Sequence, residues 1–89
     1  MADTYDVKVQ VHVCGGPIST AAALQVETVI PNFLIHEEHS YAIKQGLRET
    51  CVYDYMPNNG YLKVPELPGI GQEISPETME KTFVYSVTL

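Results

Sequence analysis

The sequence predicts an α/β fold whose first half is a strand, a helix and a second strand arranged in parallel. Valines alternate with polar residues over positions 7–13, the pattern of a strand with one apolar and one polar face. Helix-forming residues follow over positions 21–29, after a capping residue at Ser19 or Thr20. The apolar run 33–35 is too short for a helix and predicts a buried strand. Strands joined through a helix in this way pair in parallel, so we expect a βαβ unit.

Turn-forming residues mark the ends of these elements. Residues 14–17 read Cys-Gly-Gly-Pro, which predicts a tight turn after the first strand. Pro31 and Asn32 are expected to stop the helix. On that helix, we expect Gln25 and Glu27 to face solvent.

The second half predicts short elements separated by turns, because proline, glycine and asparagine recur through it. In order, we expect a helical turn within 40–49 broken at Gly46, a β-prone stretch at 50–55, a turn at 57–60, a returning strand at 61–64, an irregular stretch at 65–71, a short helix capped by Ser75 with Pro76 at its first position, and a loose final strand at 83–89.

The charge balance argues against two classes of partner. Eleven acidic side chains against five basic ones give a net charge of −6. The five lysines and arginines are scattered, whereas phosphate binding needs them clustered, so we expect neither nucleic acid nor an anionic membrane as a partner. No apolar run approaches the roughly 20 residues that span a bilayer.

The cysteines and the first residues predict a cytoplasmic protein. Cys14 and Cys51 form neither a disulfide framework nor a CxxC pair, and are expected to be reduced thiols. Residues 1–6 lack the basic and then apolar pattern of a signal peptide.

His12 and Glu37 are the candidate catalytic residues. His12 lies on the polar face at the end of the first strand, and Glu37 lies at the end of the second strand. The carboxyl ends of parallel strands open onto one mouth, where the chemistry of α/β proteins takes place. Histidine exchanges a proton near neutral pH, which suits general acid–base catalysis. Periodicity alone favours a surface histidine on a half-exposed strand, whereas the Gly-Gly-Pro turn directly after the strand leaves room for a substrate and supports the catalytic interpretation.

The run 36–39, which reads His-Glu-Glu-His, resembles a metal cluster only superficially. Its histidines are three residues apart, whereas the HExxH zinc pattern places them four apart. Neighbouring side chains at a strand end alternate faces, so only one of Glu37 and Glu38 is expected to point into the mouth. The pattern favours a solvated polar loop with one useful carboxylate, and no metal site in this chain.

Three segments resemble one family. Residues 12–18, followed by a small-residue helix, resemble the seventh barrel strand of enolase-superfamily acid dehydratases, most of all the galactonate dehydratase branch of the mandelate racemase subgroup. Residues 31–38 are similar to the eighth strand of that family, and residues 59–71 to its return into a capping domain. The resemblance implies the last two strands and intervening helix of a (β/α)8 barrel at 1–45, and a tail at 46–89 packing on the barrel and the capping domain.

The same resemblance implies an activity. These enzymes remove the proton next to a carboxylate, stabilise the enediolate on Mg²⁺, and then expel the 3-hydroxyl of a sugar acid. His12 matches the histidine that acts as base, and Glu37 matches a glutamate that contacts the substrate carboxylate. The family's Mg²⁺ ligands lie on the third, fourth and fifth strands, which have no counterpart here. We therefore expect the 89 residues to be inactive alone and to bind no Mg²⁺.

Two departures leave alternatives open. Cys14 and Gly15 stand where the galactonate branch often has proline and a larger apolar residue, so the sugar acid is open. Residues 82–89 match no family pattern and are interpreted as a read-through tail. The alternatives are a fragment of a racemase or epimerase of the same subgroup, and a non-catalytic module that pairs with a second copy or with a complementary chain.

Overall fold

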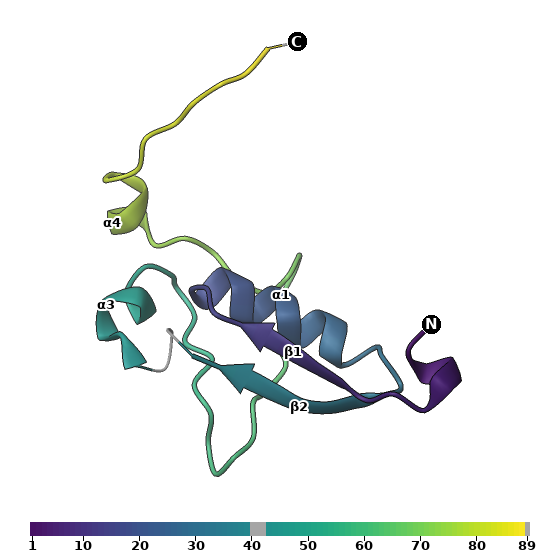
Figure 1. Ribbon diagram of the computed structural model, residues 1–89. Helices are drawn as coiled ribbons and strands as arrows, with labels where there is room; N and C mark the ends of the chain where they lie inside the picture. The colour runs from purple at the N-terminus through teal and green to yellow at the C-terminus, as the bar shows by residue number, and fades with distance from the viewer. Residues whose placement is uncertain (40–42, 89) are drawn as a thin grey trace.

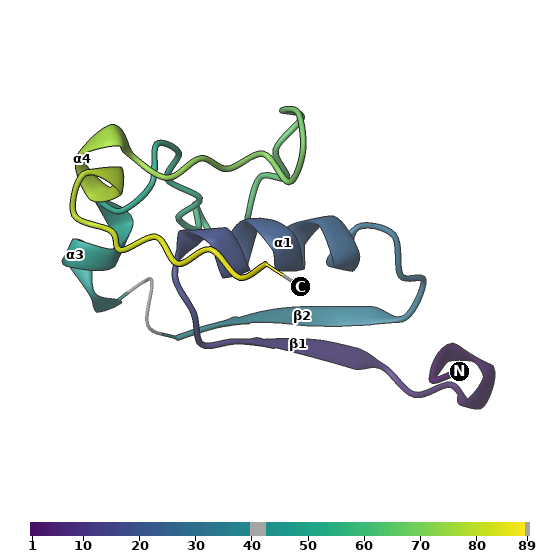
Figure 2. The ribbon, with the colours of Figure 1, turned by 90° about the horizontal axis from the view of Figure 1, so that it is seen from above.

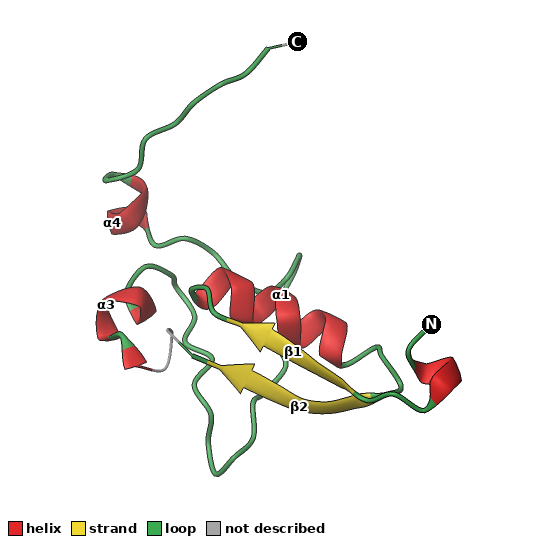
Figure 3. Ribbon diagram, in the orientation of Figure 1, coloured by secondary structure: helices red, strands yellow, loops and turns green. Residues whose placement is uncertain are grey.

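The computed structural model describes residues 1–39 and 43–88 as an α/β arrangement with a two-stranded parallel sheet (Figure 1). Helices and strands are confined to parts of the chain, and long irregular segments fill much of the second half (Figure 3). The elements are the 3₁₀ turn η1 (Asp3–Tyr5), β1 (Val9–Val13), α1 (Pro17–Glu27), β2 (Phe33–Glu38), α3 (Gln45–Arg48) and α4 (Pro76–Met79).

The expected βαβ unit is confirmed. β1 and β2 run parallel, with His12 opposite Glu37 and Val13 opposite Glu38. A register shift lies between Val9 and Gln10. Helix α1 lies along one face of the sheet and leaves the other face open (Figure 2). The alternation in β1 matches this arrangement, since Val13 is buried while Gln10 and His12 are exposed.

Helix α1 begins and ends earlier than expected. Pro17 occupies its first turn and Gly16 is the extended residue before it, so the cap is not Ser19 or Thr20. Proline suits this place because the first helical N–H groups have no partner inside the helix. Thr20 therefore lies inside the helix and is fully buried.

The core is small and lies between α1 and the sheet. Its buried apolar residues are Val13, Ala21, Ala23 and Leu24. The expectation that 33–35 form a buried strand is wrong for this chain, since Leu34 is 62% and Ile35 55% exposed. The physical reason is that α1 covers only one face of β2, and within the described residues no third strand pairs with it.

The second half follows the turn predictions better than the strand predictions. Ser75 caps α4 by accepting a bond from the Thr78 N–H at 3.3 Å, as expected. The turn at 57–60 is confirmed by the Asn58–Tyr61 bridge, with positive φ at Asn59 and Gly60. Glycine and asparagine tolerate that backbone region best.

The strands expected in this half do not form. Over 50–55 and 61–64 the pairing is limited to isolated bridges, and the described residues 83–88 form no strand. Helix α3 runs through Gly46 instead of breaking there. Residues 40–42, which belong to the helical turn expected within 40–49, lie outside the described residues. Among the described residues, every helix is too short or too polar to span a bilayer.

Candidate active site

His12 and Glu37 meet directly on the open face of the sheet. Nδ1 of His12 lies 2.8 Å from Oε1 of Glu37, and the two residues are register partners on β1 and β2. Their side chains are 68% and 36% exposed, so both are accessible from the open side. The two candidates from sequence are thus brought together at the carboxyl ends of neighbouring strands.

Gln10 completes this group. Its side-chain amide donates to Oε2 of Glu37 at 2.7 Å, so both carboxylate oxygens have a partner. The hydrogen bond from Gln10 is the largest cause of a lowered pKa of the Glu37 carboxyl. Desolvation opposes this shift, whereas the bond to His12 and the charges of His12 and His39 lower the pKa further, so that all the lowering effects together outweigh desolvation.

An ionised Glu37 fixes the tautomer of His12. A carboxylate oxygen only accepts hydrogen bonds, so the proton of the His12–Glu37 contact is assigned to Nδ1 of His12. The neutral ring then carries its lone pair on Nε2. His12 can therefore accept a proton at Nε2 while Glu37 orients the ring through its hydrogen bond with Nδ1.

Replacing Gln10 by methionine is expected to raise the pKa of the Glu37 carboxyl. Because the folded-state pKa of Glu37 is depressed, the stability it contributes is present above the unfolded pKa and is lost as pH falls through the folded one. In Gln10→Met that loss moves to higher pH. Carbon-13 NMR titration of the Glu37 carboxyl measures the shift, with Gln25→Met as the matched control. An unchanged Glu37 titration in Gln10→Met would contradict this assignment.

The helix side of β2 holds a second polar group, which was not expected from the sequence. His36 Nδ1 lies 2.8 Å from Glu27 of α1, and His36 Nε2 lies 3.3 Å from Glu38. Thr20 of α1 donates to Glu38 at 2.9 Å. The expectation that Glu27 faces solvent is wrong, because it pairs with His36 beneath the helix. Gln25 is also half-buried, near the carbonyls of 65 and 70.

The interpretation of 36–39 as a solvated loop is likewise wrong. Residues 36–38 are strand, and the side chains of His36 and Glu38 are buried against α1. Glu37 and Glu38 point to opposite faces, so one of the two carboxylates reaches the His12 side, as alternation predicts. The signal available in the sequence was the spacing of Thr20, Leu24 and Glu27, which places all three on one side of a helix.

The described residues do not fit a Mg²⁺ site. No group of three or more His, Cys, Asp or Glu side chains within 1–39 and 43–88 is arranged to hold a metal ion. Magnesium needs several oxygen ligands in octahedral geometry. Both oxygens of Glu37 already accept bonds from nitrogen donors.

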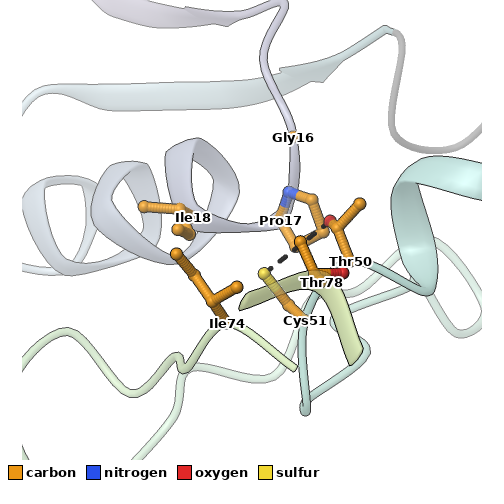
Figure 4. Close-up of a pocket in the computed structure, with 7 residues that line it drawn as sticks. All are labelled: Gly16, Pro17, Ile18, Thr50, Cys51, Ile74 and Thr78. Carbon is orange, nitrogen blue, oxygen red and sulfur yellow. Dashed lines mark hydrogen bonds between the residues drawn. The ribbon is translucent and has the colours of Figure 1, made fainter. Parts of the chain in front are cut away.

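Cys14 and Cys51 are not joined in a disulfide, and both lie outside the His12–Glu37 pair. Cys14 follows β1, and its sulfur lies 3.5 Å from Nδ1 of His39. Cys51 lines a cavity of about 240 Å³ where α1 begins, beside Ile74 and the Thr50 hydroxyl (Figure 4). Apart from the Cys51 thiol, the described residues that line this cavity carry no ionisable side chain, and the cavity reflects packing of the second half against Pro17 and Ile18.

Comparisons with known proteins point to one enzyme family. The family model described as enolase C-terminal domain-like matches residues 1–78. A D-xylonate dehydratase from Haloferax volcanii is 38% identical over 90 residues, covering all of this chain and 21% of that protein. A D-galactonate dehydratase from Ralstonia pickettii is 34% identical over 79 residues, covering 83% of this chain and 21% of that protein. The chain thus spans about a fifth of the length of the relatives it matches.

Solved structures agree in fold. A member of the enolase superfamily from Salmonella Typhimurium superposes with a TM-score of 0.84 at 63% identity, over 91% of this chain and 21% of that one. An enolase of the mandelate racemase subgroup from Agrobacterium tumefaciens gives a TM-score of 0.77 at 28% identity, over 91% and 22%. The β1–α1–β2 unit is therefore part of a (β/α)8 barrel. The chain belongs to the enolase C-terminal domain-like family, as a C-terminal segment of the mandelate racemase type that resembles the galactonate dehydratases.

Proposed function

We propose that this segment supplies the general base of a sugar-acid dehydratase. The observation that carries the proposal is the His12–Glu37 contact of 2.8 Å at the carboxyl ends of two neighbouring barrel strands. The names of the relatives support the substrate class, because D-xylonate and D-galactonate are both sugar acids. Which sugar acid this protein uses depends on residues near the mouth, such as Cys14 and Gly15, that depart from the galactonate pattern.

In the proposed reaction, Nε2 of His12 removes the proton next to the substrate carboxylate. Nδ1–H of His12 donates to Glu37, so the imidazolium that forms lies beside a carboxylate and is stabilised by it. The electron pair left at C2 then forms the C2=C3 bond as the C3–O bond breaks. The departing hydroxide takes a proton from an acid supplied by the rest of the barrel and leaves as water, and the enol product tautomerises to a 2-keto-3-deoxy acid. A racemase would instead return the proton to the same carbon, so the product distinguishes the two reactions.

Glu37 has two candidate roles in this reaction. The family resemblance implies that it contacts the substrate carboxylate. An ionised carboxylate cannot donate a hydrogen bond to another carboxylate, and the lowered pKa favours the ionised form. The geometry therefore favours Glu37 as the group that orients His12. A contact with the substrate carboxylate would require a proton on Glu37.

We propose that a complete enzyme, meaning a protein with this segment and the rest of the barrel, holds Mg²⁺ on carboxylates outside these 89 residues. Residues 1–45 would close the barrel, and residues 46–89 would pack on it and on a capping domain. The protein would act on a small sugar acid in the cytoplasm.

The isolated 89-residue chain is expected to have no dehydratase activity and no Mg²⁺ site. A complete enzyme is expected to convert D-xylonate or D-galactonate to the 2-keto-3-deoxy acid when Mg²⁺ is present. Product analysis measures the dehydratase activity, and calorimetry with Mg²⁺ measures the binding of the metal. Mg²⁺ binding to the isolated chain tighter than roughly millimolar would contradict the assignment of the metal ligands to other segments.

A further inference from the structure

The buried polar group beneath α1 has a chemistry that the proposed reaction does not use. His36 lies between two carboxylates, with Nδ1 2.8 and 3.0 Å from the two oxygens of Glu27 and Nε2 3.3 Å from Glu38. The side chains of His36, Glu27 and Glu38 are 8%, 4% and 9% exposed. Three ionisable side chains therefore lie together between α1 and β2, largely buried, at the wall of a cavity that they help to line.

The hydrogen bonds of His36 depend on where the protons of this group lie. Carboxylate oxygens only accept, so each N···O contact needs a proton between its two atoms. An imidazolium that donates from both nitrogens meets this need, and so does a neutral ring that faces one protonated carboxyl. Either form gives charge-assisted hydrogen bonds, which are shorter and stronger than bonds between neutral groups.

Two further donors complete the coordination of Glu38. The Thr20 hydroxyl donates to Oε2 at 2.9 Å, and the His39 N–H donates to Oε1 at 3.1 Å. Among the described residues, no buried side-chain nitrogen or oxygen lacks a partner. A polar network that is fully satisfied holds one geometry, whereas a partly satisfied one is costly. Thr20 and Glu27 thus fix β2 onto α1 at two points.

The open face of the sheet has no comparable support. His12 is 68% and Glu37 36% exposed, so packing on that side does not hold them within the described part of the chain. Glu37 stands between His36 and Glu38 in β2, and successive side chains of a strand point to opposite faces. Anchoring His36 and Glu38 to α1 therefore sets the direction in which Glu37 points.

We infer that Thr20, Glu27, His36 and Glu38 form a buried clamp of positioning residues, which holds Glu37 against His12 from the opposite face of β2. The clamp acts on the position of Glu37 and touches no substrate. Its effect on catalysis rests on the function proposed above, whereas its effect on the backbone of β2 does not.

The test uses the complete enzyme with Thr20→Val and Glu27→Gln. Thr20→Val keeps the shape of the side chain and removes the donor to Glu38. Glu27→Gln keeps the shape and removes the charge beside His36. Outer partners of site residues typically contribute about 10- to 100-fold to activity. We expect kcat to fall by that factor, KM to stay within about twofold, and amide hydrogen exchange of peptides covering β2 to speed up at least about tenfold.

Two matched controls separate positioning from general damage. Thr20→Ser restores the hydroxyl and is expected to restore kcat. Glu77→Gln changes an exposed glutamate of α4 that pairs with Lys81, and is expected to match the wild type. Wild-type kcat and wild-type exchange in Thr20→Val and Glu27→Gln would overturn the clamp. Faster exchange spread over the whole protein would also overturn it, as a purely structural role. If the wild type turns over no sugar acid, the proposed function fails, and the exchange of β2 alone decides the clamp.

Discussion

Replacing His12 by asparagine is expected to lower the kcat of the complete enzyme by about 10²- to 10⁴-fold, the contribution typical of a general base. Asparagine keeps a polar side chain of similar size on β1 but has no basic nitrogen. The substitution removes Nε2, the atom proposed to accept the proton, because Nδ1 of His12 already contacts Glu37. Substrate binding is expected to remain nearly unchanged, since the loss falls on the transition state.

Solvent deuterium exchange at C2 of the sugar acid gives a direct measurement of this step. Exchange in His12→Asn at the wild-type rate would show that another residue is the base. Glu37→Gln is the matched comparison on the neighbouring strand. It keeps an acceptor for Nδ1–H of His12 but loses the charge that stabilises the imidazolium, so kcat is expected to fall more than KM rises. Equal effects on the two constants would make Glu37 an ordinary substrate contact.

The elements of the first half could be predicted from local pattern, whereas their burial could not. Alternation over 7–13 and the helix-forming residues before Pro31 are local signals, and both elements are present. The helix begins before the expected cap at Ser19, because Pro17 is a favourable first residue. The exposure of Leu34 and Ile35 depends on which segments cover β2, and residue pattern does not contain that information.

The candidate site could likewise be predicted only in part. The prediction that His12 and Glu37 share one mouth needed only alternation and the polarity of parallel strands. Predicting their direct contact also requires the register of β1 against β2. That register includes a shift between Val9 and Gln10, which the sequence does not signal. The buried position of Glu27 depends on how α1 is rotated against the sheet. Packing sets that rotation, and single-residue preference would place a glutamate in solvent.

The isolated chain leaves more surface uncovered than a compact domain of its size. It exposes 6887 Å² for a mass of 9.9 kDa, whereas a compact monomer of that mass exposes about 5,200 Å². Its radius of gyration is 15.1 Å, against about 12 Å for a compact domain of this length. A groove of about 720 Å³ between α1, β2 and residues 57–64 adds to this surface, and it is lined mostly by apolar residues together with Glu27, His36 and Glu38. The tail residues Phe83, Val84, Tyr85 and Val87 are also exposed.

We therefore expect the 89-residue chain alone to form a strand-exchanged dimer or a higher oligomer, or to be only partly folded. β1 and β2 each have one edge without a partner strand in the described sheet, and such edges pair readily with another chain. Apolar burial contributes roughly 25 cal/mol per Å², which favours association. The net charge of −6 opposes it, but physiological salt screens repulsion beyond about 8 Å. Sedimentation at micromolar concentration measures the mass, and it should rise from low to physiological salt. A well-folded monomer with dispersed amide resonances at both salt concentrations would show that the segment is stable without a partner.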